Sequence, residues 1–176
     1  MTSSTDPLTP VHTAALLLAS LEALQAEAVA LGPEALTWHP AAGEWCVNEV
    51  IGHLIEAEER GFGGRIERII AEPGRMLVTW NPAKVARNRH DCEKSGVELI
   101  AELAQERERS VRLLRELRDD QLELAGQHPQ VGELHVIDLL HEWPHHDRNH
   151  VKQALSITQA YVWEHMGNAK RFAEFD

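Results

Sequence analysis

The amino-acid sequence predicts an all-α protein, a single four-helix bundle, and three observations support this prediction. The chain has 176 residues, a length that suits one domain with a core large enough to fold without disulfides. Apolar residues recur at spacings of three and four along four long segments, which is the period of amphipathic helices. No run of alternating apolar and polar residues predicts a strand. Four such helices in one domain favour a bundle.

The first predicted helix spans about residues 10–31. Thr9 and Pro10 are typical of an N-cap and a first helical position, and the Gly-Pro pair at 32–33 ends the helix. The connector that follows, residues 33–45, contains two prolines, one glycine and two tryptophans. It is too irregular for a strand.

A second helix is predicted over about residues 47–71. It starts with a capping-box pattern in which Cys46 stands where serine or threonine is usual, and Glu49 follows three residues later. Sulfur accepts hydrogen bonds weakly, so this cap should be weak. The connection that follows, residues 73–91, has no sustained period, and we expect Pro82 to break any helix there. Such a long connection lets successive helices run parallel as a crossover.

The third predicted helix spans about residues 93–117, and its charged side is expected to be a solvated face. That side carries Glu102, Glu106, Arg109 and Arg112. Residues 119–132 are expected to form a loop. The last helix spans about residues 134–166 and should be interrupted and kinked at Pro144, which removes the hydrogen bond to the carbonyl of Leu140. We expect the core to span residues 10–166 and the tail residues 167–176, with a short amphipathic stretch at 171–175.

Charge and cysteine content exclude several classes of function. The net charge is −11, from 17 Lys and Arg against 28 Asp and Glu, so nucleic acid is not an expected partner. Two cysteines form neither a CxxC site nor a disulfide framework. The N-terminal sequence lacks the pattern of a signal peptide, and no uncharged apolar run is long enough to span a membrane. These features predict a soluble, cytoplasmic protein without a membrane partner.

Histidine is over-represented, with eleven in the chain, and four of them lie between residues 141 and 150. Residues 141–145 match the zinc-binding pattern HExxH. A helical wheel places His141 and His145 on a polar face with Asp138 and Lys152, and Pro144 disturbs the register that the motif needs. We therefore reject the interpretation of residues 141–145 as a zinc-binding motif, and we expect both histidines at the surface.

The same wheel turns His146 and His150 inward, together with Leu139 and Trp143. These two histidines are four residues apart, so their rings lie one helical turn apart and can bind one ion. Imidazoles on an apolar stripe are costly unless a partner binds their nitrogens. The second helix offers His53, at the edge of its buried stripe, as a third ligand.

Two segments carry a resemblance to a known family. Residues 45–54 (WCVNEVIGHL) and 146–153 (HDRNHVKQ), with Gly132 and the Asp-Leu-Leu run at 138–140 between them, resemble the DinB/YfiT-like metalloenzymes. The resemblance implies a four-helix bundle of up-down-down-up order that is frequently a homodimer. It also implies a divalent metal held by His53, His146 and His150, the same three residues that the wheel selects.

The roles of several other residues stay open. Cys46 and His135 stand where the family commonly has Ser or Thr caps, and Cys46 is interpreted as a small buried thiol ahead of a functional one. Weaker candidates for a place near the metal are Glu142, Asp147 and Glu49. The aromatic residues are expected in the core ahead of a substrate-stacking role; they are Trp38, Trp45, Trp143 and Tyr161.

Three neutral imidazoles would leave a divalent ion its full charge and an open position, as in catalytic zinc sites. The first hypothesis is a metal-dependent enzyme that activates a low-molecular-weight thiol for S-transfer to an electrophilic small molecule, a use that the resemblance implies for several branches. The alternatives are a metal-dependent hydrolase and a non-catalytic metal-binding stress-response protein. Zinc or nickel is expected, although iron, copper and manganese also suit such a site.

Overall fold

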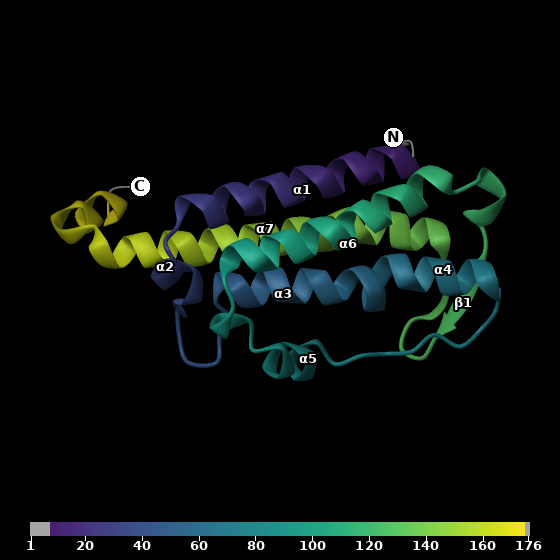
Figure 1. Cartoon of the computed structure of the whole chain (residues 1–176), viewed down its shortest axis with the longest axis horizontal. Coiled ribbons are helices and arrows are strands. Elements are labelled where there is room, and N and C mark those ends of the chain that lie inside the picture. Colours follow the sequence, from purple (N-terminus) through teal and green to yellow (C-terminus); the bar gives the residue numbers. More distant parts are fainter. Residues whose placement is uncertain (1–7, 175–176) are drawn as a thin grey trace.

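The computed structural model describes residues 8–174, and its architecture is a four-helix bundle (Figure 1). The N-terminal residues 1–7, used above for the signal-peptide expectation, and Phe175 of the predicted tail lie outside this range. The bundle consists of α1 (Pro10–Ala30), a second rod made of α3 (Val47–Ala57), η1 (Glu58–Phe62) and α4 (Gly63–Ala71), α6 (Gly96–Glu116), and α7 (Val136–His165).

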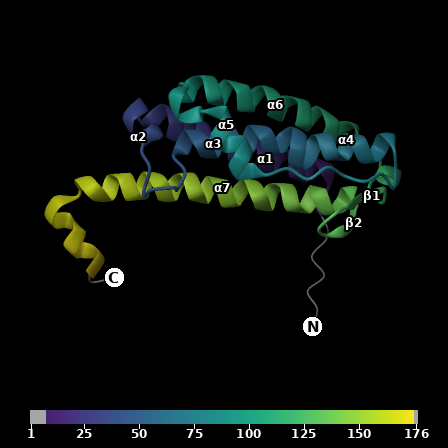
Figure 2. The same ribbon diagram turned by 90° about the horizontal axis from the view of Figure 1, so that it is seen from below.

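The helices have the up-down-down-up order. In Figure 1, α1 and α7 run in one direction, whereas the α3–α4 rod and α6 run in the other. The connection between α4 and α6 crosses the length of the bundle, as Figures 1 and 2 both show. The predicted fold class is therefore confirmed, including the parallel pair of helices that the long crossover permits.

The crossover contains two short helices, α5 (Pro82–Arg89) and η2 (Asp91–Glu93). The expectation that Pro82 prevents a helix was wrong, because Pro82 occupies the first turn of α5. Proline lacks only an N–H that has no partner at that position. The side chain of Asn81 caps the helix by accepting a hydrogen bond from the backbone N–H of Lys84 at 2.9 Å.

Short elements also occur in the other connections. A five-residue helix, α2 (Pro33–Thr37), lies in the first connector. An antiparallel hairpin of β1 (Ala125–His128) and β2 (Gly132–His135) lies where a loop was expected. The absence of strands was therefore a wrong prediction. Each strand has four residues, too few for an alternating pattern to stand out. The last described element is η4 (Gly167–Glu174).

The helix α7 continues through Pro144 as one element of 30 residues, so the predicted interruption was wrong. Pro144 has no N–H to donate to the carbonyl of Leu140. The hydroxyl of Thr13, on α1, donates to that carbonyl at 3.1 Å instead. A neighbouring helix thus satisfies the backbone group that the proline leaves without its helical partner.

The helix α1 is long and apolar enough to span a membrane, and the core helices of soluble proteins can have the same length and composition. In the bundle it packs mainly against α6 and α7. Its buried stripe includes two polar residues, Thr13 and Ser20. The composition of α1 is therefore accounted for by its place between two other helices.

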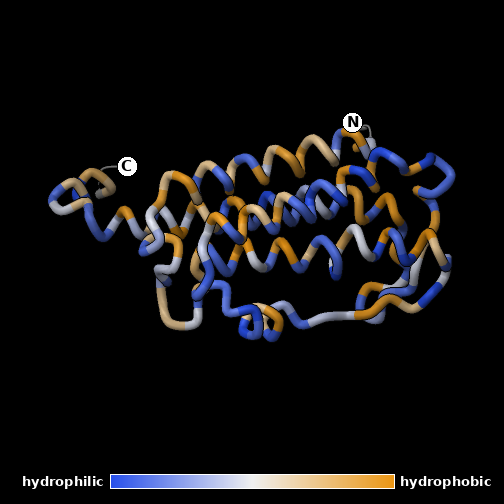
Figure 3. The backbone as a smooth tube through the Cα atoms, viewed as in Figure 1, coloured by the Kyte–Doolittle hydropathy of each residue, from blue (hydrophilic) through white to orange (hydrophobic). Residues whose placement is uncertain are grey.

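A polar layer divides the bundle core into two apolar clusters. Orange and blue alternate along the helices in Figure 3, as expected for amphipathic rods. Each rod contributes one buried polar residue between residues of the two clusters; these are Ser20, Glu58, Arg107 and Asp147. Arg107, for example, lies one turn from Leu103 of one cluster and one turn from Val111 of the other.

Candidate metal centre

Three histidines from two rods meet on the side of the bundle that the crossover covers. His53 lies on α3 and is only 6% exposed, and His146 and His150 lie one turn apart on α7. Their ring centroids are separated by 5.1 Å (His53–His146), 4.3 Å (His53–His150) and 4.5 Å (His146–His150). One nitrogen of each ring lies within 4.8 Å of the others. We call these residues the histidine triad.

The ring nitrogens are placed as the ligands of one ion would be. The Nε2 atoms of His53 and His146 are 3.1 Å apart. Two ligands that each lie about 2.0–2.1 Å from a metal, at angles of about 90–110°, are about 2.9–3.4 Å from each other. Nδ1 of His150 is 2.8 Å from Oε1 of Gln153. When Nδ1 donates to that oxygen, Nε2 of His150 keeps its lone pair for an ion.

A purely structural role fits the triad less well. Buried histidines normally have both ring nitrogens hydrogen-bonded. In the described part of the chain, however, Nδ1 of His53 and Nδ1 of His146 are buried without a hydrogen-bond partner. Within the same part of the chain, their Nε2 atoms have only each other at hydrogen-bond distance. The donor set therefore suits a divalent ion better than it suits an apolar core.

The surroundings keep the triad neutral. Burial, together with the neighbouring His150, lowers the pKa of His53 to about 3. Burial and the same neighbour, with further positive groups, lower the pKa of His146 to about 3. Burial also lowers the pKa of His150. At neutral pH the three rings are unprotonated, which is the form that binds metal.

Aromatic side chains from three different segments enclose the triad. Trp80, in the crossover, stacks on His53 at a centroid distance of 5.6 Å, and Trp45, in the connector, lies 5.1 Å from the same ring. Phe62, in the π-helical turn η1, meets His146 edge-on at 5.1 Å. Trp45 is therefore only partly core, whereas Trp143 is fully buried as expected.

An open pocket of about 650 Å³ reaches the triad at His150. Its walls come from the connector and from the second half of α7. The residues that line it are Pro40, Gly43, Glu44, Trp45, His150, Gln153, Ser156, Ile157 and Ala160. Trp38 and Tyr161, which were expected in the core, are half-buried and contact each other edge-on at 5.6 Å.

None of the three weaker candidates hydrogen-bonds to a ring of the triad in the described residues. Glu142 is exposed on the surface of α7. Glu49 accepts a hydrogen bond from the backbone N–H of Cys46 at 2.9 Å and lies 3.1 Å from Nε2 of His39. Asp147 pairs with Arg107 at 2.8 Å. Their proposed roles beside the metal have no support in these contacts.

The histidines of the HExxH match lie away from the triad. His145 is exposed, and Nε2 of His141 accepts a hydrogen bond from the backbone N–H of Leu8 at 3.0 Å. In residues 8–174, neither belongs to a cluster of potential metal ligands.

The two helices that carry the triad start without side-chain caps. Neither Cys46, before α3, nor His135, before α7, makes a side-chain cap hydrogen bond. The acidic residue three positions later supplies the reciprocal contact in each case. Glu49 accepts from the N–H of Cys46, and Asp138 accepts from the N–H of His135 at 2.9 Å.

Sequence reasoning missed the buried ion network next to the triad. Arg107 is fully buried and pairs with Glu58 at 3.1 Å and with Asp147 at 2.8 Å. Ser110 donates a hydrogen bond to the other oxygen of Glu58. Burial raises the pKa of Glu58 to about 7, against the opposing effect of Arg107. The sequence did contain a signal for this network. Arg107 and Asp147 each have an apolar residue four positions before and four positions after them, so each lies on the buried stripe of its own helix.

A comparison with known protein families identifies the family to which this chain belongs. A model of the DinB superfamily matches residues 12–154 of this chain, a stretch that includes all of the histidine triad. The chain belongs to the DinB superfamily. The family expectation formed from residues 45–54 and 146–153 is thereby confirmed.

Two proteins from Bacillus subtilis are similar to this chain, one in sequence and one in fold. The uncharacterized protein YuaE of strain 168 is 26% identical over 141 residues, which cover 73% of this chain and 86% of YuaE. The structure of YfiT, described as a probable metal-dependent hydrolase with an unusual four-helix bundle topology, superposes with a TM-score of 0.80. Its sequence is 16% identical and 93% of each chain is covered, so the likeness shows the shared fold.

Proposed function

We propose that this DinB-superfamily chain is a metal-dependent hydrolase in which the histidine triad holds one divalent ion. The observation that carries the proposal is the convergence of three neutral imidazoles beside an open pocket. They come from two rods, and among residues 8–174 the Nε2 atoms of His53 and His146 have no hydrogen-bond partner except each other. The description of YfiT, a structure with the same fold, as a probable metal-dependent hydrolase supports the same reaction class.

Some residues of the site would bind the ion, and others would shield it from solvent. His53, His146 and His150 would be its ligands, and Gln153 would keep His150 in the tautomer that presents Nε2. A divalent ion bound by three neutral ligands supplies a Lewis acid that lowers the pKa of a nucleophile and polarises a carbonyl or phosphoryl oxygen. Trp80 stacks on the His53 ring and Phe62 meets the His146 ring edge-on, and neither lines the pocket, so both would shield the ligand rings from bulk water.

The pocket walls favour water over a small anionic thiol as the nucleophile. Among the described residues that line the pocket, Glu44 is the only one with a full charge, and it is acidic. Carboxylate-bearing thiols would therefore enter without a cation to pair with. A neutral or cationic substrate fits these walls better, which places hydrolysis ahead of thiol S-transfer.

Metal-loaded protein tests the proposal directly. The metal-free protein is loaded separately with zinc, nickel, manganese, iron or copper, and then assayed on neutral and cationic esters, amides and phosphoesters. A parallel assay supplies low-molecular-weight thiols with a chlorodinitrobenzene-type electrophile. His146→Ala is the test variant, and His145→Ala, which removes an exposed histidine one residue away, is its matched control.

The outcomes separate the candidate functions. Metal-dependent hydrolysis in the wild type and in His145→Ala, lost in His146→Ala, supports the proposal. Conversion that requires a thiol, without hydrolysis, would replace it with S-transfer. Stoichiometric metal binding without turnover in either assay would leave a non-catalytic metal-binding protein, of the kind expected for a stress-response role.

A further inference from the structure

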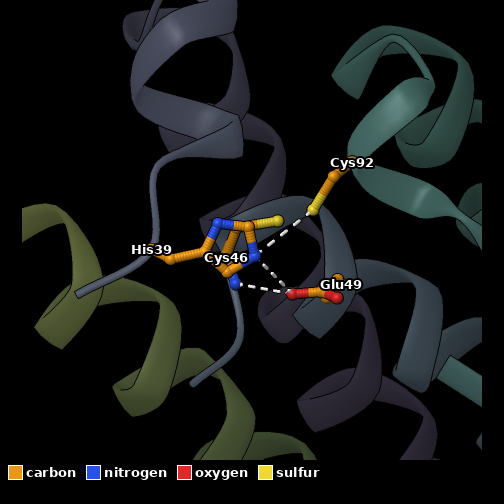
Figure 4. Close-up of side chains that lie close together, drawn as sticks. All are labelled: His39, Cys46, Glu49 and Cys92. Carbon is orange, nitrogen blue, oxygen red and sulfur yellow. Dashed lines mark hydrogen bonds and ion pairs between the residues drawn. The ribbon is translucent and has the colours of Figure 1, made fainter. Parts of the chain in front are cut away.

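A second group of potential metal ligands lies at the start of α3, separate from the histidine triad. It brings together His39 from the connector, Cys46 and Glu49 from the first turn region of α3, and Cys92 from η2 (Figure 4). One ligand atom of each residue lies within 4.8 Å of the others. We call this group the thiol cluster. The two cysteines of the thiol cluster are far apart in the sequence, so no CxxC pattern indicates a metal site there.

The ligand atoms of the thiol cluster point at a common region. Nε2 of His39 lies 3.7 Å from Sγ of Cys92 and 3.1 Å from Oε2 of Glu49. A tetrahedral zinc ion, with sulfur at about 2.3 Å and nitrogen or oxygen at about 2.0–2.2 Å, sets neighbouring ligand atoms about 3.3–3.8 Å apart. The observed distances are close to these edges.

The crossover holds Cys92 in place opposite α3. The backbone carbonyls of Asp91 and Lys94, on either side of Cys92, accept hydrogen bonds from the side-chain amide of Asn48 at 3.3 and 3.0 Å. The carboxylate of Asp91 is buried against Gly52, where a Cβ atom would lie only 1.8 Å from Oδ2 of Asp91. Glycine at position 52 thus permits the close approach that brings the two cysteines together.

Exposure differs across the thiol cluster in a way that suits ion entry from solvent. Cys46 is fully buried and Cys92 is half-buried. The side chain of His39 is 42% exposed, and that of Glu49 is 20% exposed. An ion could therefore reach the sulfur atoms through the histidine side, and all four donors would close around it.

We propose that the thiol cluster is a second metal site, which binds one zinc ion through His39, Cys46, Glu49 and Cys92. Two sulfurs, one imidazole and one carboxylate form a donor set that zinc prefers over hard cations. Four protein donors leave no open position, so the site would be structural. Binding would release the proton of each thiol to solvent, without any change of oxidation state.

The protein environment disfavours thiol redox chemistry at this site in the absence of a metal. Burial raises the pKa of the Cys46 thiol and of the Cys92 thiol. Thiols held in the neutral form attack disulfides and peroxides slowly. A coordinating cation ionises such thiols outright, which offsets the effect of burial.

The proposed ion would fix the wall of the triad pocket. It would tie the connector to the crossover, two segments without a regular period, at the point where both approach α3. Trp45 directly precedes Cys46, lies 5.1 Å from the His53 ring and lines the pocket beside His150. A zinc ion at the thiol cluster would therefore restrict the position of Trp45 without touching the triad.

Metal counting and cobalt spectroscopy test this proposal on the full chain. Reduced, metal-free protein is titrated with Zn²⁺ and, separately, with Co²⁺ as a coloured probe. The wild type should bind two ions per chain and show a sulfur-to-cobalt charge-transfer band. Because the triad has no sulfur ligand, this band reports the thiol cluster alone.

Three variants sharpen the result. Cys46→Ser should bind one ion and lose the band, while its metal-free form melts at the same temperature or higher, because serine is the better N-cap. Cys92→Ser should lose the band in the same way. His146→Ala should also bind one ion but keep the band, so a failure of the triad and a failure of the thiol cluster are distinguishable.

Absence of the charge-transfer band in the reduced wild type would overturn the proposal. A band of undiminished intensity in both cysteine variants would overturn it as well. A third contrary result is quantitative formation of a Cys46–Cys92 disulfide in air when zinc is present in excess over two ions per chain, because bound zinc would protect both thiols from oxidation.

Discussion

The histidine triad and the buried ion network lie side by side in the same bundle, yet they satisfy their polar atoms differently. His146 and Asp147 are consecutive residues of α7. His146 meets His53, with their Nε2 atoms 3.1 Å apart. Asp147 meets Arg107, which also pairs with Glu58, so opposite charges face each other across the core.

This difference indicates which cluster serves a ligand. Buried charges that pair within the protein complete a structure, and removing one partner leaves the others in a low-dielectric interior. Neutral nitrogens that face one another gain little from folding, and their arrangement becomes favourable when an ion lies between them. We therefore expect the network to govern stability and the triad to govern metal binding.

The largest expected effect comes from removing the cation of the network. Arg107→Met leaves the carboxylates of Glu58 and Asp147 buried without their partner, and should lower the free energy of unfolding by about 3–5 kcal/mol. Urea unfolding followed by circular dichroism measures the change. Arg109→Met, on the exposed side of the same helix, should stay within about 0.5 kcal/mol of the wild type. Equal stability of the two variants would contradict the structural role of the network.

The pH dependence of stability should come in part from Glu58. Its pKa is raised from 4.5 to about 7 in the folded protein, so the folded state holds this proton more tightly than the unfolded state does. The resulting stabilisation is complete below pH 4.5 and is lost as the pH rises through 7. Since one pKa unit corresponds to about 1.4 kcal/mol, Glu58→Gln should gain about 3 kcal/mol relative to the wild type between pH 4.5 and pH 8.

Urea titrations of the wild type and of Glu58→Gln at several pH values provide this measurement. The difference between the two proteins, and not the slope of either, isolates Glu58, because all other groups are shared. A difference that is constant with pH would show that Glu58 ionises normally in the folded protein.

Metal-linked stability should distinguish the triad from the network. Zinc at about 100 times its Kd should stabilise the wild type by about 2.7 kcal/mol per linked site. His146→Ala should lose the share that belongs to the triad, whereas His145→Ala should keep it. Thermal melts with and without the ion show the shift. The proposal for the triad fails if zinc stabilises both variants equally.

The smallest of these effects concerns the backbone of α7 at Pro144. Thr13→Val removes the donor to the carbonyl of Leu140 and leaves that buried group without a partner, at a cost of about 1–3 kcal/mol. Valine has nearly the same shape, so packing changes little. Urea unfolding measures the loss, and metal affinity should stay unchanged. Unaltered stability would mean that the Leu140 carbonyl has another partner.

The fold was predictable because periodic patterns in the sequence encode long helices. The stripes of residues 10–31 and 93–117 identified α1 and α6 nearly to their ends. The elements that were missed are short or depend on tertiary contacts. Considered alone, Pro82 predicts a break in a helix. In the structure Asn81 caps α5, and Pro82 occupies the first turn of that helix.

The candidate site was predictable to the extent that it follows helical geometry. The spacing of His146 and His150 fixed one side of the triad, and the inward position of His53 supplied the other. The pairing of Arg107 with Glu58 was not predictable in this way, because it depends on how α6 rotates against the second rod. The approach of Cys92 to Cys46 likewise depends on the docking of Asp91 at Gly52.

Anomalous diffraction from crystals of the metal-loaded protein, recorded at the absorption edge of the bound element, tests the central claim most directly. We predict a peak between His53, His146 and His150, at about 2.0–2.2 Å from one nitrogen of each ring. A metal-loaded crystal with no peak among these rings, or with one ring turned away from the ion, would contradict the claim.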